Sequence, residues 1–209
     1  MTGADAVGRA ADVAALGLVE PVPPDAVDRI AAALDDENPR VRAAALGALA
    51  RLEPARAAGA CERAATDPDA AVRRRAAELV ASLGPHATDA LPVALLGDDD
   101  VTVVEAAAWA LGEIGHDRVG PEAVSGLADA AQRHSDPIAR EAAVAALGAI
   151  GDPAGLPAVL AACRDKPAVR RRAVLALAPF EGPEVDAALE AALTDRDWQV
   201  RQAAEDLRR

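Results

Sequence analysis

Aromatic residues are nearly missing from this sequence: of 209 residues only Trp109, Trp198 and Phe180 are aromatic. The apolar residues, 52 % of the chain, are therefore mostly alanine, leucine and valine. Alanine costs less in a helix than any other residue, whereas strands favour alternating aromatic and β-branched residues. The composition predicts closely packed helices and argues against a β-sheet protein.

Long apolar runs and cysteines are also scarce. No apolar run approaches the length of a membrane-spanning helix, so we expect none. Asp5 and Asp12 lie where a signal peptide would carry positive charge, and we expect a cytoplasmic protein. Cys61 and Cys163 lie in alanine-rich stretches, with no histidine or further cysteine at metal-ligand spacing. We expect both to be small apolar side chains, buried or half-buried, and not a disulfide.

Positive charge is the third shortage. The chain has 22 basic and 34 acidic residues, a net charge of -12, and Lys166 is its only lysine. An acidic chain whose cations are almost all arginine resembles proteins of halophilic archaea, in which salt screens the repulsion between dense carboxylates. A GC-rich genome would also favour arginine over lysine, but the excess of acid favours the halophile interpretation.

Six segments of the chain align with one another without internal gaps. Each has a valine or alanine that we number position 0: Val41, Val72, Val103, Ala139, Val169 and Val200. Successive copies are 31, 31, 36, 30 and 31 residues apart, a period typical of helical repeats. The larger spacing after the third copy predicts a longer loop around Gly115–Gly120.

Helix signals recur at fixed positions in these copies. Three residues before position 0 stands a strong N-cap residue in five copies: Asn38, Asp69, Asp100, Asp136 and Asp197. The sixth copy has Lys166, preceded by Asp165, which could shift that cap by one residue. Pro39, Pro137 and Pro167 occupy the first helical position, where proline is accepted. We expect equivalent helices over residues 38–52, 69–83, 100–114, 136–150, 166–180 and 197–208.

One face of these helices is apolar. Position 4 is always alanine: Ala45, Ala76, Ala107, Ala143, Ala173 and Ala204. Positions 0, 4, 8 and 11 fall on one helical stripe. An alanine in that stripe lets the backbone of a neighbouring helix approach closely, so this stripe should be the core.

A second helical stretch precedes each copy. We expect these helices near residues 25–35, 54–66, 86–97, 121–134, 153–164 and 183–194, with prolines at or near their starts and glycines after the preceding helices. A further helix within residues 1–20 should cap the array. The predicted fold is an all-α, right-handed α-solenoid of about six helix pairs, one domain over residues 1–209 with its repeats in residues 25–209.

The repeated pattern of Asx-Pro-x-Val-Arg, then alanine, then Leu-Gly-x-Ile-Gly resembles HEAT-like repeats, specifically the short variety named after the phycobilisome lyases. Position 1 matches the arginine of that family in Arg42, Arg73, Arg140, Arg170 and Arg201. Val104 departs from it. The resemblance implies a right-handed superhelix whose second helices line a concave, partner-binding surface.

Enzymatic and nucleic-acid functions find little support. HEAT-like arrays that bind iron, such as deoxyhypusine hydroxylase, carry His-Glu pairs, but none of His86, His116 and His134 is followed by glutamate. Neither a phosphate-binding loop nor a nucleophile–base pair can be placed, so we expect no catalytic centre, cofactor or metal. Two arginine triplets, at 73–75 and 170–172, point in several directions around their helices, and the acidic chain opposes phosphate binding.

The candidate site is the middle of the concave face. Between Arg75 and Arg118 the sequence has no arginine or lysine and eight acidic residues. Matching positions on neighbouring second helices predict a partner-binding surface of Arg74, Glu78, Glu105, Trp109, Gly112, Glu141, Ala145, Arg171 and Leu175. We expect a protein or peptide partner that is basic or amphipathic, bound by a non-catalytic adaptor or scaffold. The alternative is a lyase, or a lyase accessory, that holds a chromophore or cofactor in the same groove.

Trp109 admits two interpretations. It lies off the buried stripe, where other copies have Gly47, Glu78, Ala145 and Leu175. It could fill a gap between repeats, or it could be an exposed anchor for a cationic or aliphatic group of a partner.

Overall fold

The computed structural model describes residues 3–208, and within this range every regular element is a helix. The α-helices are α1 (Gly3–Leu16), α2 (Ala26–Ala33), α3 (Pro39–Leu52), α4 (Pro54–Ala64), α5 (Ala70–Val80), α6 (Ala90–Leu95), α7 (Val101–Ile114), α8 (Pro121–Arg133), α9 (Pro137–Ile150), α10 (Leu156–Ala162), α11 (Pro167–Ala176), α12 (Pro183–Ala192) and α13 (Trp198–Leu207). Two short 3-10 helices, η1 (Ala81–His86) and η2 (Pro153–Gly155), precede α6 and α10.

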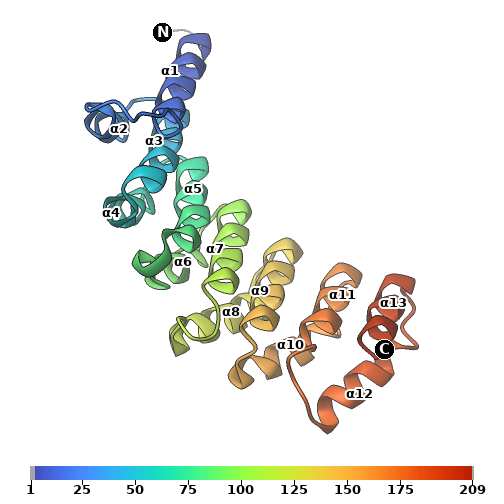
Figure 1. Cartoon of the computed structure of the whole chain (residues 1–209). Coiled ribbons are helices and arrows are strands. Elements are labelled where there is room, and N and C mark those ends of the chain that lie inside the picture. The colour runs from blue at the N-terminus through green and yellow to red at the C-terminus, as the bar shows by residue number, and fades with distance from the viewer. Residues whose placement is uncertain (1–2, 209) are drawn as a thin grey trace. The chain divides into compact units, whose positions relative to one another are not determined.

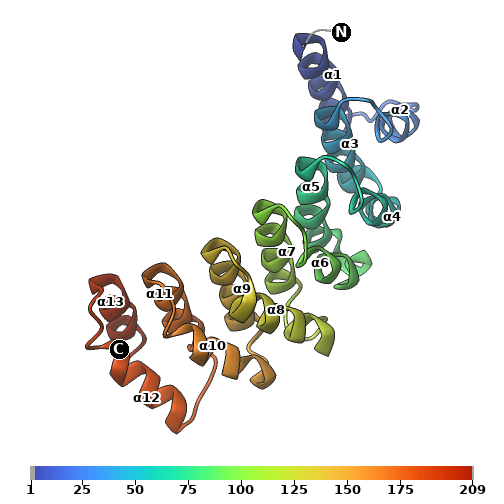
Figure 2. The same cartoon turned by 180° about the vertical axis from the view of Figure 1, so that it is seen from behind.

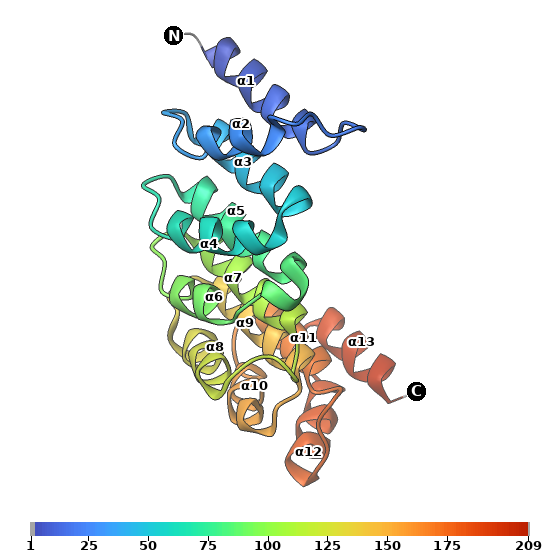
Figure 3. The ribbon, with the colours of Figure 1, turned by 60° about the vertical axis from the view of Figure 1, so that its left-hand side comes forward.

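The chain forms two compact units, Met1–Leu91 and Pro92–Arg209. In the first unit α3 packs between α1 and α5, with α2 and α4 against the same layer. In the second unit α7, α9, α11 and α13 lie side by side in chain order (Figures 1 and 2), and α8, α10 and α12 pack against them on one side as a second layer (Figure 3). The single repeat domain expected over residues 1–209 stays a prediction.

The predicted N-caps start the second helices of the pairs. The side chains of Asn38, Asp69, Asp100, Asp136 and Asp197 each accept a hydrogen bond from the backbone N–H two residues on, at 2.8–3.0 Å. The suggested shift of the sixth cap to Asp165 is wrong, because α11 still begins after Lys166 and has no side-chain cap. The carboxylate of Asp165 is engaged instead by the guanidinium of Arg140.

The predicted apolar stripe is the core. All six alanines at position 4 are fully buried, and most side chains at positions 0 and 8 are at most 3 % exposed. Removing this apolar surface from water is the main favourable term in folding. The alanines let neighbouring helices approach closely, and fully buried leucine and valine side chains such as Leu111 and Val103 fill the space around them.

Several helix boundaries differ from the sequence prediction, two of them for a clear reason. The helix expected over 86–97 spans only Ala90–Leu95, because Gly84 has a positive φ of 58° and Ala87 is extended. The helix expected over 166–180 ends at Ala176, since Pro179 has no N–H to continue the hydrogen-bond ladder. The longer loop expected at 115–120 is confirmed, between α7 and α8.

Candidate functional site

Three arginines at position 1, Arg42, Arg140 and Arg170, each tie their second helix to the loop before the next one. Arg140 on α9 donates from Nε and Nη2 to the two carboxylate oxygens of Asp165, at 2.6 and 2.9 Å. Its Nη1 atom donates to the carbonyl oxygens of His134 and Ser135. We call this arrangement an arginine clamp: a position-1 arginine whose fork holds an aspartate 25 residues later and whose third nitrogen bonds carbonyls at its own helix start.

The clamp recurs in both units. Arg42 holds Asp67 with two bonds of 2.7 Å, and Arg170 holds Asp195 at 2.9 and 2.7 Å. The hydrogen bond from Arg140 lowers the pKa of the Asp165 carboxyl, and that from Arg170 lowers the pKa of Asp195. Bidentate guanidinium–carboxylate pairs are the strong class of ion pair. These arginines therefore hold the stack together and are not free to bind a partner.

The clamp is missing where α7 meets α9. Position 1 of α7 is Val104, which is fully buried, and the place of the aspartate is taken by His134. The imidazole retains one interaction of the aspartate, because its Nδ1 accepts a hydrogen bond from the Asp136 N–H at 3.1 Å. Arginine and aspartate are thus both replaced at the same interface.

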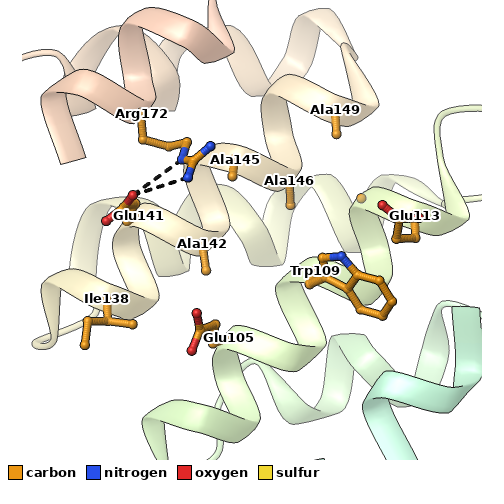
Figure 4. A pocket seen from close by; sticks show the side chains of 11 residues that line it. Glu105, Trp109, Glu113, Ile138, Glu141, Ala142, Ala145, Ala146, Ala149 and Arg172 are labelled. Atoms are coloured by element: carbon orange, nitrogen blue, oxygen red, sulfur yellow. Dashed lines mark hydrogen bonds and ion pairs between the residues drawn. The ribbon is translucent and has the colours of Figure 1, made fainter. Parts of the chain in front are cut away.

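A groove of about 370 Å³ lies between α7 and α9. It is lined by Glu105, Trp109, Gly112, Glu113, Ile138, Glu141, Ala142, Ala145, Ala146, Ala149 and Arg172. Four alanines of α9 form its floor, and Trp109 stands on α7 at its side (Figure 4). A Cβ built on Gly112 would lie 3.4 Å from the Cα atom of Ala146, an ordinary contact distance, so α7 and α9 are not pressed together at this position. The small side chains of α9 thus leave a hollow beside a large aromatic ring.

Trp109 is half exposed, at 50 %, which favours the anchor interpretation over gap filling. Glu105 and Glu113 lie four residues before and after it on α7, both exposed, and neither makes an ion pair within residues 3–208. Residues four apart on a helix share a face. The indole is therefore flanked by two unpaired carboxylates.

The opposite side of the groove carries arginines. Arg172 on α11 lies over Glu141, with its Nε and Nη2 atoms 3.5 Å from the carboxylate (Figure 4). Arg171 lies 3.8 Å from the same carboxylate. These distances exceed the 2.6–2.9 Å of the clamps, so Glu141 is neutralised only loosely.

The structure brings together five of the nine predicted site residues. Glu105, Trp109, Gly112, Glu141 and Ala145 all line the groove. Arg171 and Leu175 lie on the neighbouring α11, where Leu175 is 40 % exposed, but they are not part of the lining. Arg74 and Glu78 lie on α5 in the first unit, where they pair with each other at 3.3 Å. Their membership of the same surface stays a prediction.

Sequence reasoning missed several lining residues. Glu113 follows Trp109 by four residues, so helical spacing alone could have found it. Ile138, Ala142, Ala146 and Ala149 share the exposed face of α9 with Glu141 and Ala145, and carry no chemical signal beyond small or apolar character. On α11 it is Arg172 that lines the groove, whereas the predicted Arg171 lies beside it, 3.8 Å from Glu141, and its part in partner binding stays a prediction.

The two cysteines and the possible metal ligands were the remaining candidates for chemistry within residues 3–208. Cys61 is buried and Cys163 half-buried, both as free thiols, and burial raises their pKa values to about 12 and about 11. Among the described residues no group of three histidines, cysteines or carboxylates could hold a metal ion. No helix in residues 3–208 is both long and apolar enough to cross a bilayer.

Family models match most of the chain. A model described as HEAT repeats matches residues 57–133 and 124–208, and one described as HEAT repeat matches residues 26–54. No curated protein matches the sequence.

Solved structures of repeat proteins resemble the fold. Escherichia coli YibA has a TM-score of 0.61 at 17 % identity, covering 92 % of this chain and 71 % of that one. An engineered protein gives 0.59 at 22 % identity, covering 87 % and 96 %. A designed armadillo repeat protein gives 0.55 at 15 % identity, covering 87 % and 98 %. These likenesses concern the fold alone, and the predicted all-α solenoid class is confirmed.

Proposed function

Because the chain belongs to the HEAT-repeat family, we propose that it is a non-catalytic adaptor or scaffold that binds a protein or peptide in the groove between α7 and α9. The observation that carries this proposal is the half-exposed Trp109 beside an alanine floor. Tryptophan is enriched among residues that dominate binding energy at protein interfaces. We propose a partner that is basic or amphipathic, since Glu105 and Glu113 flank the indole without cationic partners among the described residues.

The division of labour among the arginines supports a binding role over a catalytic one. The guanidinium groups of Arg42, Arg140 and Arg170 are already hydrogen-bonded in the clamps. The groove itself presents carboxylates, a guanidinium, an indole and methyl groups, and no nucleophile next to a base. Such a surface recognises a partner by shape and charge.

Three finer assignments belong to the same proposal. We assign the repeats to the short variety named after the phycobilisome lyases, because spacings of 30 and 31 residues are below those of ordinary HEAT units. We propose a cytoplasmic protein of a halophilic archaeon, on the strength of the net charge of -12 and the single lysine. Its melting temperature should then rise between about 0.1 and about 2 M KCl. An unchanged value would favour GC-rich coding as the reason for the composition.

A small-molecule ligand is the alternative occupant. The groove volume of about 370 Å³ falls at the lower end of small-molecule sites. The groove volume is the one observation that favours the alternative function, a lyase or lyase accessory that holds a chromophore. Thermal shift and absorbance measurements with candidate chromophores and nucleotides would test it, and a saturable shift abolished by Trp109→Ala would establish this alternative.

The adaptor proposal is tested by affinity capture from the native organism with matched baits. The wild-type chain, Trp109→Ala and Trp198→Ala are immobilised in parallel, because Trp198 is equally a large exposed aromatic, at 64 %. A partner of the groove should be retained by the wild type and Trp198→Ala, and should bind Trp109→Ala at least ~30-fold more weakly, as for a hot-spot residue. Equal retention by all three baits would overturn the proposal for this groove.

A further inference from the structure

The groove has opposite charges at its two sides. On α7, Glu105 and Glu113 flank Trp109 and have no cationic partner among residues 3–208. On α11, Arg171 and Arg172 share one carboxylate, that of Glu141 on α9. The α7 side therefore has a surplus of negative charge, and the α11 side a surplus of positive charge.

The guanidinium groups of the two α11 arginines do not use all their hydrogen-bond donors. The Nε atoms of Arg171 and Arg172 are shielded from solvent and make no hydrogen bond. The Nε atom of Arg172 lies 3.5 Å from Glu141, yet it is not aligned to donate to it. These two Nε atoms are closed to a partner, but the side chains of Arg171 and Arg172 are 38 % and 40 % exposed, and a guanidinium group matches a carboxylate with two acceptor oxygens. A partner's carboxylate can therefore reach the exposed parts of both guanidinium groups, and would form closer ion pairs there than the 3.8 and 3.5 Å contacts of Glu141.

The α7 side suits a cation. An indole face attracts a guanidinium or ammonium group, and a nearby carboxylate adds to that attraction. Trp109 offers the ring, and Glu105 and Glu113 lie on the same face of α7, one on each side of it. Between the two charged sides, Gly112 and the alanines of α9 leave room only for small side chains of a close-lying chain.

We infer that the groove selects a polypeptide segment with an ordered charge pattern: a basic residue over Trp109, small apolar residues on the alanine floor, and an acidic residue at Arg171 and Arg172. This inference rests on the proposed function and refines it, because a merely basic segment would leave the arginine side unused. Neighbouring helices are about 8–10 Å apart, so α7 and α11 are separated by about 16–20 Å. An extended chain rises about 3.3 Å per residue. The two charged residues should therefore be about five positions apart.

Four acetylated, amidated hexapeptides test the pattern. The first has arginine, four alanines and glutamate; the others replace the arginine, the glutamate or both by glutamine. Binding is followed at constant ionic strength by the indole N–H resonance of Trp109 in isotope-labelled protein, assigned with Trp198→Phe. Short peptides of this size are expected to bind with dissociation constants on the order of millimolar, which such titrations resolve. We expect the charged peptide to bind best, with about fivefold lost for each charged end that is removed.

Protein variants assign each preference to its side. Glu105→Gln with Glu113→Gln should reduce the preference for arginine to the part that the indole supplies, and should keep the preference for glutamate. Arg171→Gln with Arg172→Gln should remove the preference for glutamate and keep that for arginine. Glu122→Gln with Glu181→Gln is the control for the glutamate pair, since it raises the net charge by the same amount at two exposed positions outside the groove. The control should keep both preferences.

Failure of the inference is distinct from failure of the proposed function. If all four peptides shift the Trp109 resonance with one dissociation constant, the groove binds peptides and the charge order is wrong. If the control variant erases the preferences as well as the groove variants do, only the overall field acts and the inference is overturned. If no peptide shifts the Trp109 resonance while other resonances respond, the peptide site lies elsewhere and both proposals fall.

Discussion

The interface between α9 and α11 and that between α7 and α9 are built from the same repeat, yet they differ in what holds them. At α9–α11, Arg140 clamps Asp165, and a Cβ built on Gly148 would lie 2.6 Å from the Cα atom of Ala176. At α7–α9, Val104 and His134 replace the clamp, and the same construction on Gly112 gives 3.4 Å. The groove with Trp109 lies at the second interface.

The difference shows how a repetitive stack can carry a site. Where the clamp and the close approach are kept, arginines and glycines serve the stack. Where the clamp is missing and the helices are less close, apolar side chains make the interface, and the exposed face has charged and aromatic residues. Position 1 holds the structural arginines, whereas positions 2 and 6 hold Glu105 and Trp109 on the exposed side.

The largest expected effect comes from breaking a clamp. Arg170→Met replaces the unbranched stem of a side chain that is 5 % exposed, and leaves the half-buried carboxylate of Asp195 without its partner. We expect a loss of ~3 kcal/mol in the free energy of unfolding, measured by urea denaturation. Arg172→Met is the matched control and should cost at most ~1 kcal/mol, because its ion pair is loose and 40 % exposed. Equal losses would mean that the clamp contributes nothing special.

Removing the carboxylate of the clamp between Arg140 and Asp165 should make stability less sensitive to acid. Asp165→Asn should cost ~2 kcal/mol at pH 7, as for hydrogen bonds to charged groups. The hydrogen bond from Arg140 lowers the folded-state pKa of Asp165, so its contribution is complete above the unfolded pKa of about 3.9 and is lost as the pH falls through the folded pKa. Urea denaturation at several pH values should show a constant gap above about pH 5 and a narrowing gap below about pH 4. A gap that persists unchanged in strong acid would contradict this account.

Two glycines compare the closeness of the two interfaces directly. Gly148→Ala should destabilise by ~1–2 kcal/mol, because overpacking against the α11 backbone exceeds the gain in helix propensity. Gly112→Ala places its methyl group at ordinary contact distance from α9 and should be neutral or slightly stabilising. Thermal denaturation of the two variants checks the sign of each effect. If both lower stability equally, the two interfaces are not different in closeness.

Installing the missing clamp would erase the distinction between the two interfaces. Val104→Arg alone buries a charge without a partner and should be strongly destabilising. Adding His134→Asp supplies the carboxylate at the equivalent position, and a double-mutant cycle should show a favourable coupling of ~1 kcal/mol. Zero coupling would show that backbone geometry, and not residue identity, keeps the clamp from forming there.

Helix capping and helical periodicity predicted most of the fold. Asn38 and Asp136 cap helices, and Ala107 and Ala143 lie in the core, because capping and helical periodicity depend on near neighbours. The clamps were not predicted, since each joins residues 25 positions apart. Their signal was present, however: the chain lacks the arginine at Val104 and the aspartate at His134 together.

The groove was predicted in part for the same reason. Glu105, Trp109 and Gly112 share one helical face, and Glu141 and Ala145 occupy the matching positions of the next copy. Which residue of the arginine triplet reaches the groove depends on side-chain direction and on the rotation of α11 against α9, which the sequence does not specify. The exposure of Trp109 likewise required the structure.

The free energy of unfolding of Trp109→Ala tests most directly whether the exposed face of α7 and α9 is kept for binding. An indole that is 50 % exposed over small neighbours adds little to the stack. The account predicts a change within ~0.5 kcal/mol of the wild type, the range of ordinary surface substitutions. A loss of ~3–5 kcal/mol, typical of a buried tryptophan, would contradict it and make Trp109 a packing residue.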